Sequence, residues 1–336
     1  MTGGVSLSFV RDEASLAALE PEWWQLWQRA PAATPFQSPG WLIPWWRAFK
    51  PGTLLTVAVR MGGRLVGLAP FYVEGSGQRA RILALGISIS DYQDVLVEAG
   101  MHEPVLAAIA NGYADAPEPW GEWEMTELAP GASALGIPVP AGCTESAGAA
   151  AVCPVLGGLD AADAPESALP TGMRRKLRML GHRIDRHGAA HILSARDRDP
   201  DWWLGELWRL HEARWRSVGQ CGLLGDCRLR AFHREAMPEL IARKLLRLHA
   251  LVLGKAVVGI YYGFHHNRRA HAYLGGFDPS FSYYSPGTVL VGHAVGRAAA
   301  EGARELHFLR GGEAYKYAWG ATDRWNSRRV LRRHRP

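Results

Sequence analysis

The feature of this 336-residue sequence that most restricts its fold is a short motif that occurs once in each half. Gly62-Gly-Arg-Leu-Val-Gly67 and Gly254-Lys-Ala-Val-Val-Gly259 each combine a turn glycine with a second glycine a few residues into the returning strand. Alternating apolar residues flank both turns, as is typical of β-hairpins. Helices precede each hairpin, and further strands and a helix follow it. We therefore expect a duplicated mixed α/β (α+β) domain with two similar sheets.

Hydrophobic periodicity and turn residues predict the elements of both halves. The expected strands are 54–60, 65–73, 81–85, 95–97, 123–128, 245–253, 256–264, 270–275 and 305–309. The expected helices are 102–113, 173–188, 201–215 with Asp201 as its cap, 231–240, 286–301 and 314–319. Residues 129–170 are rich in Ala, Gly and Pro, which favours an interdomain connection. We expect an N-terminal domain at 1–155, a connection with a basic helix at 156–200, and a C-terminal domain carrying the donor site at 201–336.

The bulk composition, 48% hydrophobic and 21% charged residues, is that of a globular protein. No basic segment followed by an apolar core opens the chain, and no run of about 18 apolar residues occurs. The four cysteines form no Cys-x-x-Cys pair, and the histidines lack zinc-ligand spacing. We expect a reduced, cytoplasmic protein without a metal site, and do not predict a metal pair at Cys221 and Cys227.

The formal net charge of +6 is concentrated in two basic runs, at 174–186 and at 324–335. Such runs favour anionic partners, namely a CoA phosphate, a nucleic acid or an acidic lipid surface. A solvated protein face explains each run equally well. Neither run is interleaved with aromatic residues for base stacking, which argues against RNA.

One candidate site lies at Tyr284-Ser285-Pro286-Gly287-Thr288, ahead of an apolar helix. Serine is a favoured N-cap, proline suits the first helical position, and Gly287 lets a ligand approach the backbone. A helix N-terminus entered from a sheet is suited to bind a pyrophosphate. The alternative is a well-capped structural helix.

A second candidate site is the segment from Phe308 to Gly320. A strand ends at Arg310, Gly311-Gly312 turns the chain, and a short helix presents Tyr315, Lys316 and Trp319. Cationic and phenolic groups beside such a turn suit an active site. The alternative is a surface ion pair between Arg310 and Glu313.

Several segments together resemble a known family. They are Leu210-His-Glu-Ala-Arg-Trp215, Tyr273-Leu-Gly-Gly-Phe-Asp278, Ser285-Pro-Gly287 and Arg310-Gly-Gly-Glu-Ala-Tyr-Lys316-Tyr-Ala-Trp-Gly320. In the first half, Thr34-Pro-Phe-Gln-Ser-Pro39 with Trp41 and Asp91-Tyr-Gln-Asp94 add to the likeness. The chain thereby resembles the BioF2-like, cellulose-biosynthesis-associated acetyltransferases of the GNAT superfamily. These are relatives of the Fem-type transferases, which contain two GNAT-like folds and take amino acids from aminoacyl-tRNA.

The resemblance implies tandem GNAT-like domains and acyl transfer from a thioester such as acetyl-CoA to an amine. It implies phosphate binding at Ser285, Pro286, Gly287 and Thr288, and pantetheine along 270–275, which includes Gly275. The usual pyrophosphate loop carries a basic residue or Gln before Gly-x-Gly/Ala, whereas this chain has only Ser-Pro-Gly. The N-terminal half has no Ser-Pro-Gly, which suggests one cofactor site.

The chemistry requires a base for the amine and donors for the tetrahedral oxyanion. No Ser-His-Asp order is visible, so we expect direct attack. Base candidates are Asp91, Asp94, His211 and Asp278. The alternatives are a packed, hydrogen-bonded histidine for His211 and a turn residue for Asp278. We expect Lys316 to stabilise the oxyanion or phosphate charge, with Arg310 nearby. Tyr315 or Tyr317 is the expected proton donor to the thiolate.

Three functions follow from these patterns. The first is an acyl-CoA-dependent N-acyltransferase acting on a small amine. The second is an aminoacyl-tRNA-dependent transferase of the Fem type, whose basic runs contact RNA and whose binding falls steeply with salt. The third is a GNAT-like interaction module without activity, in a polysaccharide-biosynthesis or secretion assembly. The sequence names neither the acyl chain nor the acceptor.

Overall fold

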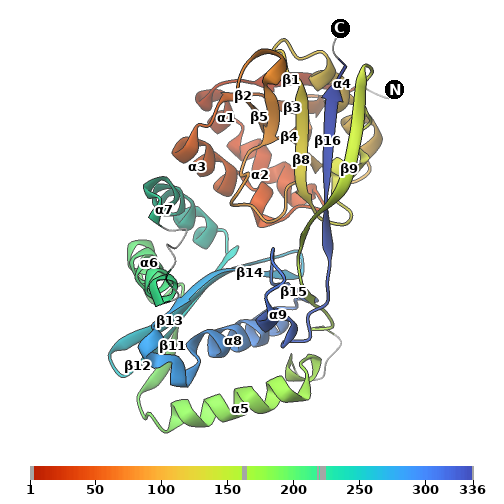
Figure 1. Ribbon diagram of the computed structural model, residues 1–336. Helices are drawn as coiled ribbons and strands as arrows, with labels where there is room; N and C mark the ends of the chain where they lie inside the picture. Colours follow the sequence, from red (N-terminus) through yellow and green to blue (C-terminus); the bar gives the residue numbers. More distant parts are fainter. Residues whose placement is uncertain (1–3, 161–164, 218, 220–224, 335–336) are drawn as a thin grey trace. The chain divides into compact units, whose positions relative to one another are not determined.

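The computed structural model describes residues 4–160, 165–217, 219 and 225–334. The chain forms two compact units (Figure 1). Unit 1 consists of Met1–Ala151 with Trp325–Pro336, and unit 2 of Val152–Arg324. These units differ from the expected boundaries at residues 155 and 200. The basic helix packs within unit 2, and the end of the chain returns to a sheet of unit 1.

Unit 1 holds two sheets, of strand order β1-β3-β4-β7 and β2-β5-β6-β8-β16-β9. Its strands are β1 (Ser6–Val10), β2 (Thr53–Leu54), β3 (Thr56–Met61), β4 (Arg64–Ala69), β5 (Phe71–Glu74), β6 (Arg81–Ala84), β7 (Leu96–Val97), β8 (Glu122–Leu128), β9 (Cys143–Val152) and β16 (Trp325–Arg333). Its helices are α1 (Glu13–Ala18), α2 (Glu20–Arg29), α3 (Pro39–Phe49) and α4 (His102–Ala114). The strand expected at 65–73 is divided at Pro70, which has no N–H to give to a ladder.

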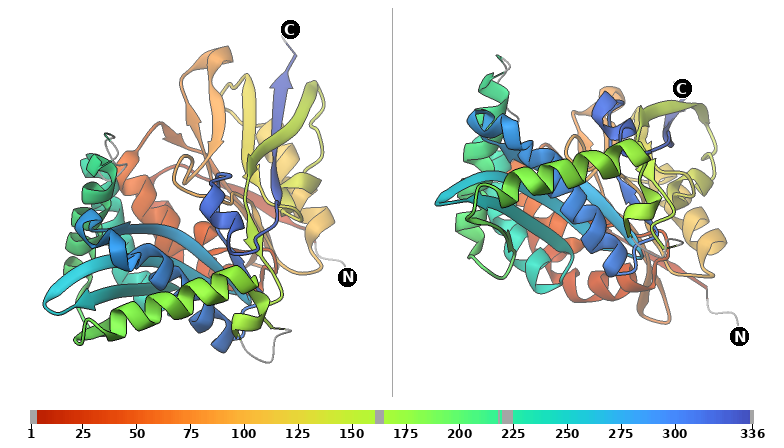
Figure 2. Two further views of the ribbon diagram at one scale, coloured as in Figure 1. Left: turned by 60° about the horizontal axis from the view of Figure 1, so that its bottom comes forward. Right: turned by 90° about the horizontal axis from the view of Figure 1, so that it is seen from below.

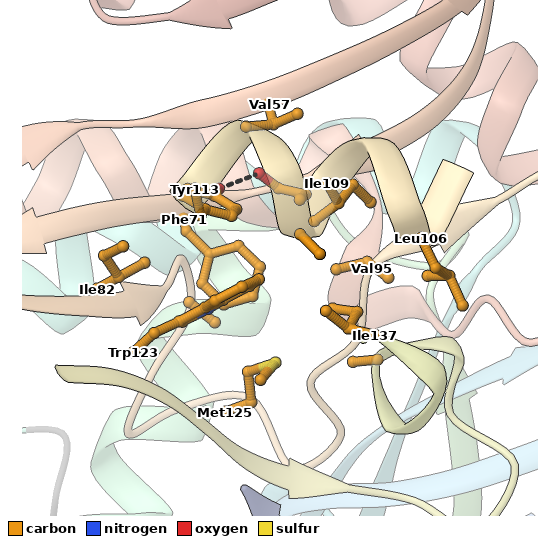
Figure 3. Packing of buried hydrophobic residues seen from close by; sticks show 14 of the residues in the cluster. Val57, Phe71, Ile82, Val95, Leu106, Ile109, Tyr113, Trp123, Met125 and Ile137 are labelled. Carbon is orange, nitrogen blue, oxygen red and sulfur yellow. Dashed lines mark hydrogen bonds between the residues drawn. The ribbon is translucent and has the colours of Figure 1, made fainter. Parts of the chain in front are cut away.

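The core of unit 1 is aromatic where α4 meets the strands (Figure 3). The ring of Tyr113 lies 4.5 Å from that of Trp123 and 5.7 Å from that of Phe71, measured between centroids. The Tyr113 hydroxyl donates to the carbonyl oxygen of Leu55 at 2.8 Å. The polar atom of this buried phenol is therefore satisfied by backbone that regular strand pairing leaves free.

Unit 2 holds one sheet, of order β10-β15-β14-β13-β12-β11. Its strands are β10 (Val155–Leu156), β11 (Ala190–Ser194), β12 (Leu246–Leu253), β13 (Ala256–His266), β14 (Arg269–Phe277) and β15 (Glu305–His307). Its α-helices are α5 (Thr171–Asp185), α6 (Pro200–Ser217), α7 (Cys227–Ala242), α8 (Pro286–Ala300) and α9 (Ala314–Tyr317). In Figures 1 and 2, α6 and α7 lie on one side of this sheet, and α8 lies on the other with α5 alongside it. Asp199 rather than Asp201 caps α6, because its carboxylate accepts from the Trp202 N–H at 2.8 Å.

The two glycine hairpins occupy corresponding places in the two units. β1-β3-β4 and β11-β12-β13 are both antiparallel, and each unit adds a parallel pair, β6 with β8 and β14 with β15. The second glycine of each motif has the same role. A Cβ on Gly67 would lie 2.2 Å from the Val105 side chain of α4, and one on Gly259 would lie 2.8 Å from the Cβ of Pro286 in α8. Each glycine lets a helix approach its sheet closely, which supports the duplication. The sheet of unit 1, unlike that of unit 2, is divided.

Candidate active site

The central feature of unit 2 is the divergence of β14 from β15. The parallel pairing of these strands covers only Arg269–His271 and Glu305–His307. β14 continues to Phe277 paired with β13, whereas the chain after β15 turns towards β10, where the Phe308 N–H donates to the carbonyl of Pro154 at 2.9 Å. Among the described residues, no strand pairs with β14 on its other side beyond His271. The two strands therefore part after three residue pairs.

The chain passes from β14 to α8 through a short 3-10 helix, Pro279–Tyr284. The Asp278 carboxylate caps it by accepting from the Ser280 N–H at 3.0 Å and from the Ser280 hydroxyl at 2.6 Å. These bonds hold the pKa of Asp278 below its ordinary value. Asp278 is therefore a turn residue, as the alternative interpretation had it, and a poor base.

The start of α8 differs from the expected serine cap. Ser285 is left-handed, with φ of +46°, and its side chain does not cap the helix. Its hydroxyl is 3.5 Å from the Ser282 carbonyl oxygen instead. A Cβ on Gly287 would meet only the Phe277 ring, at 3.8 Å. The first turn of α8 is therefore approachable at Gly287, and Thr288 beside it is partly exposed. Gly275 lies on β14, and a Cβ there would lie 3.1 Å from the Ile260 carbonyl oxygen.

His211 lies on α6 where this helix crosses β14. A Cβ on Gly276 would lie 2.4 Å from the backbone nitrogen of His211, so only glycine permits this close crossing of α6 over β14. The His211 side chain is 3% exposed, and its Nε2 accepts from the indole N–H of Trp215 at 2.9 Å. Burial, and then the charge of Arg214, lower the pKa of His211 to about 4.

Since an indole can only donate, a neutral His211 carries its proton on Nδ1. That Nδ1 has no hydrogen-bond partner among the described residues. The ring is thus a donor, and its one basic nitrogen is occupied by Trp215. This geometry fits the packed-histidine interpretation and argues against a general base.

Lys316 differs most from its expected environment. The side chain is only 2% exposed, and Nζ donates to the carbonyl oxygens of Leu309, Arg310 and Gly311 at 3.1, 2.7 and 2.9 Å. Nζ also lies 2.9 Å from a Glu313 carboxylate oxygen. An ammonium group has three N–H donors, so none remains for an oxyanion. Lys316 holds the turn after β15, and its ion-pair partner is Glu313, three residues before it.

The two tyrosines of α9 have different environments. The Tyr317 hydroxyl donates to Asp323 at 2.7 Å, which raises the pKa of Tyr317. Tyr315 is 51% exposed, and its ring packs edge-on to Phe308. Partial burial, and then the Glu313 carboxylate, raise the pKa of Tyr315, so its phenol is protonated at neutral pH. Tyr315 is the better placed proton donor.

A cation that the sequence analysis did not single out lies near the end of β14. The Arg214 guanidinium lies 5.6 Å from the Phe277 ring centroid and 5.8 Å from that of Trp215. Its charge contributes to the pKa shifts of His211, Glu313 and Tyr315, so it lies near all three. Arg214 was inside the quoted family motif, but nothing in one sequence distinguishes it from the other arginines of α6.

The two aspartates of the first half lie in unit 1. The Asp94 carboxylate accepts from the N–H groups of Val95, Ser133 and Ala134 at 2.8–2.9 Å, which makes it a structural acceptor. Burial opposes these bonds and raises the pKa of Asp94 to about 7. Asp91 is 8% exposed, and its carbonyl oxygen accepts from the Asn326 amide at 3.2 Å. The roles of Asp91 and of the half-buried Arg310 in catalysis stay predictions.

The C-terminal basic run is a structural strand, β16, whose arginines bind acidic residues and carbonyls. Arg328 and Arg332 donate to Glu124 and Glu122 of the neighbouring β8 at 2.7 and 3.0 Å. Arg329 is 6% exposed and donates to Glu145 and to the carbonyls of Ala134 and Ile137. These three of the six arginines in the run at 324–335 are therefore paired with glutamates within unit 1.

No group of three or more His, Cys, Asp or Glu side chains within the described residues is arranged to hold a metal ion, and Cys221 lies outside those residues. In the part of the chain that the structure describes, no helix is both long and apolar enough to cross a membrane.

Unit 2 thus has a mixed sheet in which β14 and β15 diverge, and the helix α8 is entered from this sheet. Residues 171–317 match the family model of the acetyltransferase (GNAT) domain. The sequence matches no curated protein. Residues 171–317 therefore form a GNAT domain, and the chain as a whole is related in fold to FemX. The narrower resemblance to the BioF2-like branch stays a prediction.

Solved structures share this fold at low sequence identity. The crystal structure of FemX is 10% identical, covers 96% of both chains and has a TM-score of 0.66. A conserved protein of unknown function from Bacteroides thetaiotaomicron is 13% identical, with 97% of this chain and 100% of that chain covered and a TM-score of 0.62. The C-terminal domain of a putative lysylphosphatidylglycerol synthetase from Agrobacterium fabrum is 12% identical, with 80% and 81% covered and a TM-score of 0.51.

Proposed function

We propose that the chain is an N-acyltransferase that transfers an acyl group from acyl-CoA to a small amine by direct attack. The observation that carries the proposal is the parting of β14 from β15 after three residue pairs, close to the approachable first turn of α8. A thioester donor with amide groups in its arm and phosphates at its end has groups to match both features.

The donor would bind with its diphosphate at Ser285, Pro286, Gly287 and Thr288 and its pantetheine along β14, past Gly275. Free N–H groups at a helix start bind phosphate oxygens, and a strand edge bonds to amides. The thioester would then lie where β14 and β15 part. The site needs no metal for this chemistry.

In the reaction, the amine nitrogen attacks the thioester carbonyl carbon, and the C–S bond of the tetrahedral intermediate then breaks. Tyr315 would give its phenol proton to the departing thiolate, because its raised pKa keeps it protonated. The amine proton passes to a base, for which Asp91 is our candidate. Since the donors of Lys316 are occupied, we do not assign it the oxyanion.

An aminoacyl-tRNA-dependent transferase of the Fem type is the second candidate. The exposed basic residues of α5, among them Arg175, Lys176 and Arg178, favour it. The arginines of β16 do not, since they bind glutamates and carbonyls of unit 1. An RNA donor would make affinity fall steeply with salt, whereas a CoA donor forms few phosphate contacts.

Ligand-dependent thermal shifts with acetyl-CoA, longer acyl-CoAs and tRNA test these candidates, because a ligand that binds only the folded state stabilises it by RT ln(1 + [L]/Kd). Gly287→Val should weaken acetyl-CoA binding tenfold or more, which is about 1.4 kcal/mol. The fold should survive, since a Cβ at this position would meet only the Phe277 ring, at an ordinary contact distance of 3.8 Å. Gly296→Ala, a glycine of the same helix with nothing within 4 Å, is the matched control. Unchanged affinity in Gly287→Val returns the motif to a structural role, and no stabilisation by any donor favours the inactive module.

A further inference from the structure

The segment that would bind the donor phosphates contains no cation of its own. From Ala270 to Gly296 the sequence has no lysine or arginine, and Asp278 adds a negative charge close to α8. A helix start supplies N–H groups and about half a unit of positive charge, far less than a CoA donor carries in negative charge. A phosphate site at Gly287 therefore needs a cation from another element.

That cation is present on α5. The Arg183 Nη1 donates to the carbonyl oxygen of Tyr283, two residues before Ser285, at 3.0 Å. The same guanidinium lies 4.5 Å from the centroid of the Tyr283 ring. Its other contact within the described residues is the weak acceptor Sδ of Met179, at 3.5 Å. A guanidinium has five N–H donors, so Arg183 retains donors for phosphate oxygens.

Tyr283 adds an exposed aromatic ring beside the Arg183 guanidinium. Its side chain is 60% exposed, the most exposed large hydrophobic residue of the described chain. Arg183 stacks on the ring and Tyr284 meets it edge-on at 5.2 Å, which orients the ring. An exposed aromatic ring beside a cation is what nucleotide bases and phosphates bind, because the base stacks and the phosphate pairs with the cation.

The position of Arg183 relative to α8 is set by packing. α5 lies along α8 (Figure 2), and a Cβ on Gly292 of α8 would lie 2.7 Å from the Leu177 side chain of α5. Met173 and Leu180 are buried on the same face of α5. Of the other basic residues of the run, Arg175, Lys176 and Arg178 are exposed. Only Arg183 reaches back to the segment before α8.

We propose that Arg183 and Tyr283 form the binding site for the phosphorylated adenosine end of the acyl donor, with α5 supplying the cation that the Ser285-Pro-Gly287 turn lacks. This inference rests on the proposed acyl-CoA donor. Arg183 binds a phosphate group of the donor, and the adenine stacks on Tyr283. The basic run is thereby divided into one binding residue and several solvated ones.

Isothermal titration of the full chain with acetyl-CoA tests the proposal. Arg183→Gln should raise the Kd about tenfold, and Tyr283→Ala about fivefold or more. Arg175→Gln, which removes the same charge from the same helix, should change it less than twofold. The effect of Arg183→Gln should shrink as salt increases. A Kd in Arg183→Gln equal to that of Arg175→Gln would overturn the proposal.

Truncated donors show which phosphate group of the donor Arg183 binds. They also distinguish a failure of the Arg183 site from a failure of the proposed acyl-CoA donor. If 3′-dephospho-acetyl-CoA is insensitive to Arg183→Gln, the 3′-phosphate is the partner; if it loses affinity too, the diphosphate is. Turnover of S-acetylpantetheine, which lacks both, should be equal in wild type and Arg183→Gln, and a reduction there would refute a nucleotide role. If the wild-type protein binds no acetyl-CoA, the proposed function fails. Titration with adenosine 3′,5′-bisphosphate then tests the nucleotide site by itself. If adenosine 3′,5′-bisphosphate binds and Arg183→Gln weakens its binding, the nucleotide site is supported. If it does not bind, the nucleotide site is refuted.

Discussion

Lys316→Met gives the sharpest test of how the turn after β15 is held. Lys316 is buried, and its ammonium group binds three consecutive carbonyl oxygens, those of Leu309, Arg310 and Gly311. Leu309 and Gly311 have positive φ values of 60° and 104°, an unfavourable backbone for leucine. Methionine preserves most of the apolar stem but leaves these carbonyls without their donor.

The expected cost follows from the contacts. A buried acceptor that loses its partner costs about 1–3 kcal/mol, and water will reach some of these carbonyls, so about 3 kcal/mol is expected for the three. Glu313 adds little, because its side chain is 57% exposed and it rehydrates when Lys316 is removed. For a unit of this size, that loss lowers the melting temperature by roughly 6–12 °C.

Urea unfolding and differential scanning calorimetry of the full chain measure this loss, with unit 2 expected to melt first. Glu313→Gln removes the ion pair but not the carbonyl bonds, and should cost less than about 1 kcal/mol. Lys255→Met, at an exposed hairpin turn, controls for the loss of one charge. Unchanged stability with a hundredfold loss of kcat in Lys316→Met would refute this reasoning and restore Lys316 as the oxyanion donor.

Three further predictions concern unit packing and pH. Burial lowers the pKa of both His233 and His249 to about 3, from an ordinary 6.5. As the pH falls, these histidines are protonated in the unfolded chain before they are protonated in the folded protein. The stability that they contribute is therefore complete above pH 6.5 and declines below it, by up to about 2 kcal/mol per histidine at pH 5. Equal urea midpoints at pH 7.5 and pH 5 would contradict this. Gly276→Ala should cost more than about 2 kcal/mol because the new methyl group meets backbone of α6, whereas Gly296→Ala, in an open helical position, should stabilise by roughly 0.5–1 kcal/mol, both by thermal melts. Arg329→Gln should destabilise unit 1 by roughly 3 kcal/mol in the same assay, since it leaves Glu145 and two carbonyls unpaired; a change below about 0.5 kcal/mol would make the last strand dispensable.

Many of the local elements could be predicted from the sequence, although β1, β9, β11 and β16 were not among the expected strands. The hairpin at Gly254-Lys255, the helix starting at Pro286 and the strands around them lie close to where periodicity and turn residues indicated. These signals are local, because side-chain alternation and turn geometry depend on residues within one element. The duplication was visible for the same reason, since the matching glycines Gly67 and Gly259 recur at equivalent positions in one-dimensional order.

Only the tertiary structure decided what the charged residues do. The sequence predicted an unpaired basic segment at 324–335, because the glutamates that pair with Arg328, Arg329 and Arg332 are about two hundred positions away in the chain. The sequence predicted that Lys316 is a cation available to a ligand. Its actual partners are backbone carbonyls, which every residue has and which no sequence pattern indicates. An ionised group is defined by its surroundings, and pairing across sheets and turns supplies those surroundings only once the chain has folded.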